Sequence, residues 1–268
     1  FELNQSKILP AQIHYLVAIS YLFIDSYEDA QKELLKFYKS REQLSDYNIY
    51  LSMTYLKLGE YKKAKQKIMS VSSKYGVLYF ELMIEIAMKL GQQKSVRYYL
   101  NMAYESGCVS HNIQVNEAIL MIVKYKYEEA QQLLENIIKV DIDNIAALNN
   151  LIRVYKHLYR KQKLEIVLTH YLKKNPGYLP YIWELAQLYS QQARHEKLSE
   201  IIKDIYKADP KNASIREVFL IPSNYDSNDQ IINYRKKIHS KIIDALKNEL
   251  YPIRADKQFR STAFYLSY

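Results

Sequence analysis

The sequence predicts an all-α protein, a solenoid of antiparallel helix pairs, and three observations support that prediction. Glycine and proline are scarce, with 5 Gly and 6 Pro among 268 residues, whereas sheet-rich folds need such residues in turns at spacings of about 8 to 12 residues. Apolar residues make up 49% of the chain and charged residues 25%, so the chain can form a sizeable core. The third observation is a sequence repeat of about 34 residues, a period typical of stacked helix pairs.

Small or apolar residues that follow a tyrosine mark the repeat. The clearest copies are Tyr27-Glu28-Asp29-Ala30, Tyr61-Lys62-Lys63-Ala64 and Tyr127-Glu128-Glu129-Ala130. We call the last position of this four-residue motif the anchor. In the six units it holds Ala30, Ala64, Val96, Ala130, Leu164 and Leu198. The slot four residues later holds Leu34, Ile68, Leu100, Leu134, Leu168 and Ile202. Nine residues before the anchor stand Tyr21, Tyr55, Ala87, Met121, Tyr155 and Tyr189, and twelve before it stand Ala18, Ser52, Ile84, Ala118, Ile152 and Ala186. We therefore expect six units over residues 11–210, of which the third departs most from the pattern.

Each unit is expected to form two antiparallel helices of about 12 to 14 residues, joined by a short turn such as Leu58-Gly59-Glu60. Pro176 and Pro210 fall in equivalent places between units, where one helix has to stop before the next begins. Because a single helix pair cannot bury its apolar face, neighbouring pairs must stack into a continuous core.

Both ends of the chain depart from the repeat. Residues 1–10 are expected to be the end of a preceding helix or a tail, and residues 211–268 a capping helix, a connector helix and an extended tail. In order, the C-terminal elements are a helix that starts at Ala213 and ends before Pro222, a helix over 227–250 that opens on the capping box Ser227-x-x-Gln230, and an extended stretch over 259–268.

The formal net charge of +9 is concentrated in two segments. Residues 57–74 hold six lysines and one glutamate, and residues 151–174 hold seven Lys or Arg and one glutamate, so acid slightly exceeds base in the remainder. A continuous basic surface that would bind the phosphates of a nucleic acid is therefore not expected. Each patch could attract an acidic partner, and the alternative for both is a solvated lysine face.

Several kinds of site are not indicated by the sequence. The glycines are too far apart for a nucleotide-binding loop, the six histidines lack metal-site spacing, and no Ser or Cys stands in a nucleophile motif. We therefore expect no catalytic residue, no metal site and no cofactor in this chain. The lone Cys108 fits a reducing compartment, and no membrane span or secretory leader is visible, so we expect a cytoplasmic protein that binds no membrane.

The Tyr, small-residue, Tyr-x-x-Ala and Pro slots of the frame resemble the tetratricopeptide repeat (TPR) family over residues 11–210. This resemblance implies a right-handed α-solenoid whose first helices line a concave groove, and a groove that holds peptides or partner proteins. The candidate binding residues on that inner face are Tyr15, Tyr50, Asn116, Asn149, Asn150, Arg153, Lys156, Trp183, Glu184 and Gln187. The groove would be apolar at its start and polar at its end.

Two of these residues, Asn116 and Asn150, occupy the same slot of successive units. An asparagine amide can donate and accept hydrogen bonds at the same time, so it can bind a peptide backbone whatever side chains the peptide carries. The pair resembles a short version of the asparagine ladder of O-GlcNAc transferases; the alternative is two ordinary helix-surface or capping asparagines. Arg153 and Lys156 could bind an acidic tail, and Trp183 either packs between units or forms a binding hot spot.

The C-terminal part carries a second resemblance. The runs "IPSNYDSNDQIINYRKKIHSKIIDAL" and "FRSTAFYLSY" are similar to the connector between repeats and catalytic region in bacterial SPINDLY-type, O-GlcNAc-transferase-like glycosyltransferases. This resemblance implies that the chain is the acceptor-recruiting part of such an enzyme, with the catalytic residues and sugar-nucleotide site lying downstream. Two alternatives remain: a self-standing TPR adaptor or co-chaperone-like protein, and a helical-repeat RNA-binding protein suggested by the period and the positive charge.

Overall fold

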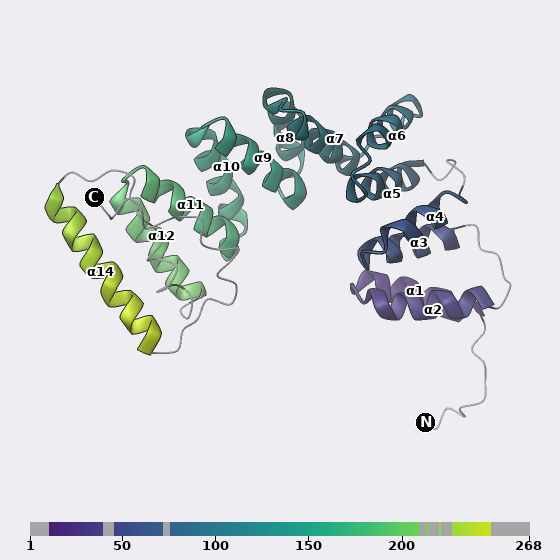
Figure 1. Cartoon of the computed structure of the whole chain (residues 1–268), viewed down its shortest axis with the longest axis horizontal. Coiled ribbons are helices and arrows are strands. Elements are labelled where there is room, and N and C mark those ends of the chain that lie inside the picture. The colour runs from purple at the N-terminus through teal and green to yellow at the C-terminus, as the bar shows by residue number, and fades with distance from the viewer. Residues whose placement is uncertain are drawn as a thin grey trace, which may run out of the picture. The chain divides into compact units, whose positions relative to one another are not determined.

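The structure is a computed structural model that describes residues 11–39, 46–71, 76–209, 213, 220 and 227–247. Every regular element within these ranges is an α-helix (Figure 1). In chain order the helices are α1 (Ala11–Phe23), α2 (Tyr27–Lys39), α3 (Tyr47–Lys57), α4 (Tyr61–Ile68), α5 (Gly76–Lys89), α6 (Gln93–Glu105), α7 (His111–Val123), α8 (Tyr127–Val140), α9 (Ile145–His157), α10 (Lys161–Lys174), α11 (Leu179–Gln191), α12 (His195–Ala208) and α14 (Asn228–Lys247). The prediction of an all-α chain is confirmed.

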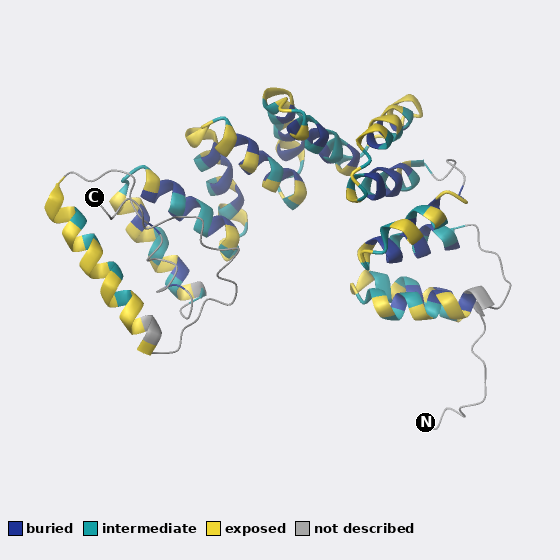
Figure 2. Cartoon of the chain, viewed as in Figure 1, coloured by how far each residue is buried: buried dark blue, intermediate teal, exposed yellow. Residues whose placement is uncertain are grey.

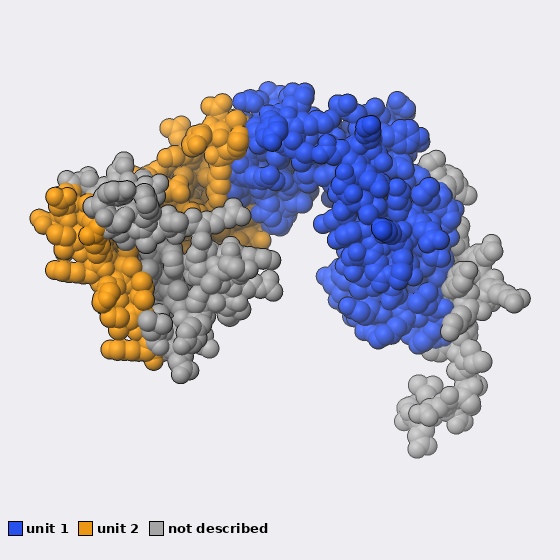
Figure 3. Space-filling view, viewed as in Figure 1, with its two compact units in different colours: residues 1–154 blue, residues 155–268 orange. Residues whose placement is uncertain are grey.

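The helices pack in consecutive pairs. Contacts join α1 to α2, α3 to α4, α5 to α6, α7 to α8 and α11 to α12. Further contacts link one pair to the next, as between α3 and α5, α5 and α7, and α10 and α11. This arrangement confirms an α-solenoid of helix pairs. The chain forms two compact units, residues 1–154 and 155–268, with the division inside α9 (Figure 3).

The repeat slots predicted from the sequence are the core of both units. The six anchor residues, from Ala30 to Leu198, are between 0% and 5% exposed, and the six residues twelve positions earlier are between 0% and 6% exposed. Figure 2 shows the buried residues as stripes along the helices. Ser52 is the polar member of these slots, and its hydroxyl donates to the Ala64 carbonyl oxygen across α3 and α4 at 2.9 Å, which satisfies a polar group that would otherwise be costly to bury.

The turn inside each pair ends the first helix by one shared motif. A residue with φ between +53° and +78° follows the helix in all six described repeats: Asp25, Gly59, Gly91, Tyr125, Tyr159 and Ala193. The N–H of the next residue then donates to the carbonyl in the slot nine residues before the anchor, at 2.8–3.0 Å: Ser26 to Tyr21, Glu60 to Tyr55, Gln92 to Ala87, Lys126 to Met121, Arg160 to Tyr155 and Arg194 to Tyr189. This is the long hydrogen bond of a Schellman cap. Glycine adopts positive φ easily and Asp tolerates it, but for most other residues it costs about 1–2 kcal/mol, so Tyr125 and Tyr159 are strained.

The C-terminal helix α14 lies where the connector helix was predicted. Its first turn is capped by Ser227, whose hydroxyl oxygen accepts from the Gln230 N–H at 3.3 Å. The predicted capping helix falls, apart from Ala213 and Leu220, outside the described residues, and so do residues 1–10 and the predicted extended tail.

Candidate functional site

The two tyrosines at the predicted start of the groove belong to an aromatic cluster in the first unit. Tyr15 is only 7% exposed, and its ring lies 5.3 Å from that of Phe37 and 5.9 Å, edge-on, from that of Tyr50. Tyr50 is half-buried against the same cluster. Packing therefore uses most of the surface of these rings, and Tyr50 presents more of its ring to a ligand than Tyr15 does.

The two asparagines of the predicted ladder have the same side-chain hydrogen bond. The Asn116 amide nitrogen donates to the Asn112 carbonyl oxygen at 3.0 Å, and that of Asn150 donates to the Ala146 carbonyl oxygen at 2.8 Å. Each bond runs back one helical turn within its own helix. An amide has two N–H donors and one acceptor oxygen, so each side chain retains a donor and an acceptor that these bonds do not use.

The remaining predicted residues are divided between the two units. Asn149 and Arg153 are exposed on α9 in the first unit, whereas Lys156, at the end of the same helix, belongs to the second unit. Trp183 is half-buried on α11, consistent with a partial packing role.

Three predicted residues meet in one cleft of the second unit. Lys156 of α9 forms an ion pair with Glu184 of α11, and Gln187 lies one helical turn further along α11. The cleft has a volume of about 340 Å³. Its complete lining is Tyr155, Lys156, Tyr159, Lys161, Leu164, Glu184, Gln187, Leu188 and Gln191, and we call it the Tyr159 cleft. Lys156 is thus paired with Glu184, and the binding of an acidic tail by Arg153 and Lys156 stays a prediction.

The sequence interpretation missed Tyr159, a strongly exposed residue of this lining. It is 82% exposed and its φ is +54°. The signal is present in the repeat frame, because Tyr159 occupies the turn slot in which two other units have Gly59 and Gly91. The frame predicts a turn at that slot but says nothing of the side chain that the turn presents.

A carboxylate on α10 links three segments of the second unit. Glu165 accepts hydrogen bonds from Arg194 at 2.5 Å, from Lys197 at 3.0 Å and from the Tyr189 hydroxyl at 3.2 Å. Burial acts to raise the pKa of Glu165, but the hydrogen bonds from Arg194 and Lys197 outweigh it, so this pKa lies below its ordinary value. Burial, and then the Glu165 charge, raise the pKa of Tyr189. The cluster holds the second helix of one repeat against the next repeat.

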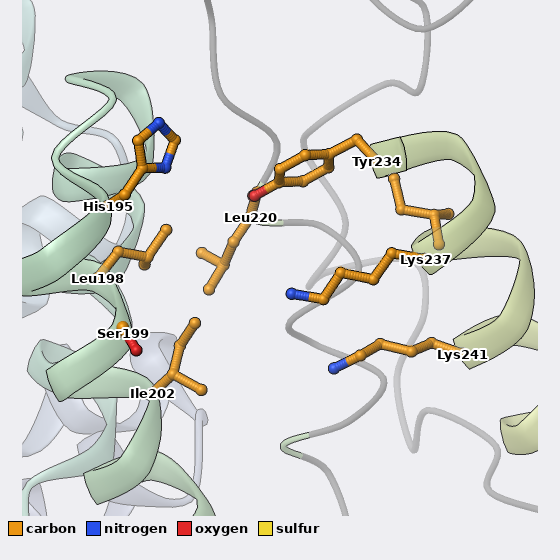
Figure 4. A pocket seen from close by; sticks show the side chains of 9 residues that line it. His195, Leu198, Ser199, Ile202, Leu220, Tyr234, Lys237 and Lys241 are labelled. Carbon is orange, nitrogen blue, oxygen red and sulfur yellow. The ribbon is translucent and has the colours of Figure 1, made fainter. Parts of the chain in front are cut away.

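A second cavity, of about 270 Å³, lies between α12 and α14 (Figure 4). Lys237 and Lys241 extend from α14 toward α12, and the Tyr234 hydroxyl donates to the Leu220 carbonyl oxygen at 3.5 Å. Lys241 also donates to the Tyr206 hydroxyl of α12 at 3.3 Å. Within the second unit these bonds join α14 to α12 and to Leu220, so Tyr234 and Lys241 have a structural role.

Metal sites and membrane spans are both absent from the described part of the chain. No three His, Cys, Asp or Glu side chains there are placed to hold a metal ion. No helix within the same ranges has the length and apolar character needed to cross a membrane.

The comparisons with known proteins identify the fold. No protein-family model and no curated protein matches the sequence. Among solved structures, the thermophilic TPR protein TTC0263 of Thermus thermophilus is similar with a TM-score of 0.56 and 14% identity, over 67% of this chain and 98% of that one. A TPR protein from Parabacteroides merdae is similar with a TM-score of 0.56 and 12% identity, over 90% of this chain and 96% of that one. A chain of the Cut9–Hcn1 hetero-tetramer of the APC/C is similar with a TM-score of 0.59 and 16% identity, over 75% of this chain and 40% of that one. The chain therefore has the helix-pair fold found in TPR proteins.

Proposed function

We propose that this chain is a protein–protein interaction scaffold that holds an extended segment of its partner along the first helices of its repeats. Two findings support the proposal. The fold is shared with TPR proteins, and one chain of similar fold belongs to a hetero-tetramer. The observation that carries the proposal is the matched pair Asn116 and Asn150, whose equivalent back-bonds hold two amides in the same way on two first helices.

Peptide capture by a double variant tests the scaffold role. A library of random unstructured peptides is passed over the immobilised protein, and the bound fraction is compared between wild type and Asn116→Ala/Asn150→Ala. Each lost hydrogen bond is worth about 0.5–1.5 kcal/mol, so we expect the double variant to retain roughly a tenth of the peptide.

The matched control removes two amides from second helices. Asn101 of α6 and Asn136 of α8 are both exposed, and Asn101→Ala/Asn136→Ala is expected to bind peptides as the wild type does. Equal capture by all three proteins would show that the asparagine pair does not hold peptides.

We further propose that the partner is a protein acceptor and that the chain is the recruiting part of a SPINDLY-type glycosyltransferase, acting in the cytoplasm. The support is the sequence similarity of the connector run and of "FRSTAFYLSY"; this second run lies outside the described residues. The reading frame beyond Tyr268 tests this proposal. Several hundred residues with an α/β pattern would support it, and a stop codon would leave the alternative of a self-standing adaptor.

A further inference from the structure

The floor of the Tyr159 cleft is apolar and its rim is polar. Tyr155, Leu164 and Leu188 are between 4% and 5% exposed. Around them lie the Lys156–Glu184 ion pair and the exposed Lys161. An apolar floor with a polar rim is the usual anatomy of a small protein-binding hot spot, because the rim keeps water from the buried contact.

The size of the cleft limits what can occupy it. Its volume of about 340 Å³ is at the lower end of ligand pockets, which run from about 300 to 1,000 Å³. It can therefore take one large side chain with the backbone around it, but not a large cofactor.

Tyr159 lines this cleft with most of its side chain uncovered. The residue is 82% exposed and lies in the turn shared by all described repeats, where its φ is +54°. Tyrosine also offers a rigid, amphipathic ring that loses little conformational entropy on binding.

The charges around the cleft select for an acidic occupant. Arg160 and Lys161 are exposed beside Tyr159, and residues 155–174 of the same unit hold six Lys or Arg against Glu165 alone. Glu165 is itself engaged by Arg194 and Lys197. The rim contributes Glu184, but this carboxylate is paired with Lys156, so the net field at the cleft is positive.

We propose that the Tyr159 cleft is a docking site for an acidic peptide that inserts one aromatic or large aliphatic side chain, which Tyr159 covers. The proposal rests on the scaffold function proposed above and adds a partner class to it. A peptide fits better than RNA, because the lining includes the carboxylate of Glu184 and the amides of Gln187 and Gln191, whereas a phosphate track needs a run of unpaired cations.

Fluorescence anisotropy with two designed peptides tests the proposal. The probe is an unstructured, labelled peptide of Glu, Ser and Gly with one central Phe, and its partner peptide has Ser in place of that Phe. We expect the Phe peptide to bind the full chain about tenfold more tightly, because filling the apolar floor supplies the difference. Equal affinity for the two peptides would overturn the proposal.

Variants at Tyr159 locate the binding. Tyr159→Gly removes the ring and suits the positive φ, so the variant is expected to fold and to bind the Phe peptide about tenfold more weakly; Tyr159→Phe keeps the ring and is expected to bind within about twofold of wild type. Tyr125→Gly is the matched control, because Tyr125 occupies the same turn slot, is 80% exposed, and does not line the cleft. Unchanged binding by Tyr159→Gly, or an equal loss in Tyr125→Gly, would contradict the assignment.

Charge variants and a competitor complete the test. Lys161→Glu is expected to weaken binding of the Phe peptide more than Lys173→Glu, which reverses the same charge in the same basic segment but outside the cleft lining. If oligouridylate displaces the peptide and binds more tightly, the surface is a nucleic-acid site and the proposal is wrong. Failure of the scaffold itself is distinguishable, because the random peptide library would then not be captured by wild type at all.

Discussion

At the scale of single residues, the turn slot shows how backbone conformation and residue type can disagree. All six residues in this slot adopt positive φ, yet only Gly59 and Gly91 are glycines. The hydrogen bond from the following N–H forms in every copy, so the packing of the helix pair imposes the conformation whatever residue is present. Non-glycine residues in this slot therefore lower the stability of their repeat.

A reciprocal pair of substitutions measures this cost. Ala193→Gly is expected to stabilise the protein by about 0.5–1 kcal/mol. The glycine relieves the backbone strain at positive φ, and its greater conformational entropy in the unfolded chain offsets part of that gain. Gly91→Ala is expected to destabilise it by about 1 kcal/mol. A Cβ at Gly91 would meet nothing within 4 Å, so this effect is purely conformational. Urea unfolding measures both, and the same sign for both changes would contradict the argument.

At the scale of elements, features that depend on the period of a single helix could be predicted from the sequence. Contacts that depend on the packing of two helices could not. The anchor alanines and the slots around them follow a helical period, so their burial could be predicted from the frame. The pairing of Lys156 with Glu184 could not, because two side chains 28 positions apart meet only once the helices α9 and α11 have packed. The Tyr159 cleft is built on that pairing and was missed for the same reason.

The Glu165 cluster gives a pH-dependent link between elements. The pKa of Glu165 is lowered in the folded protein, so its contribution to stability is present above its unfolded pKa of about 4.5 and is lost as the pH falls through the folded pKa. Because the partner cations are partly exposed, we expect Glu165→Gln to cost about 1 kcal/mol at neutral pH. Urea unfolding at a series of pH values measures the difference between variant and wild type, which should shrink below about pH 4.5.

The control for this experiment is Glu200→Gln on the exposed face of α12. It changes the same charge without disturbing the cluster and should leave stability within about 0.5 kcal/mol of wild type. A Glu165→Gln effect that is constant from neutral to acid pH would show that the carboxylate contributes through packing and not through its charge.

At the scale of the whole molecule, helices in each unit contact their partner and the helices of the next pair. Stability in such an array is close to a sum over repeats and neighbouring interfaces, so distant repeats can unfold separately. The chain carries a natural reporter of this behaviour, because its single tryptophan, Trp183, lies in the second unit.

Overpacking one unit should therefore leave the other unit unchanged. Ala64 is fully buried in the first unit, and Ala64→Leu is expected to cost about 1–3 kcal/mol. Circular dichroism should show an earlier loss of helix in urea, while the Trp183 fluorescence midpoint stays at its wild-type value. Ala186→Leu, at an equally buried site on α11, should move the Trp183 midpoint. If Ala64→Leu shifts both signals together, the chain unfolds as one cooperative body.

The shared turn also matters for chemical synthesis. Positive φ is the low-energy backbone of mirror-image amino acids, which is why D-residues are used in designed turns. A segment made by peptide ligation could therefore carry a D-amino acid at Ala193 or Gly91 without disturbing the Schellman bond that follows. Each described repeat thus contains a site where a protease-resistant or labelled D-residue would suit the native backbone at least as well as its natural counterpart.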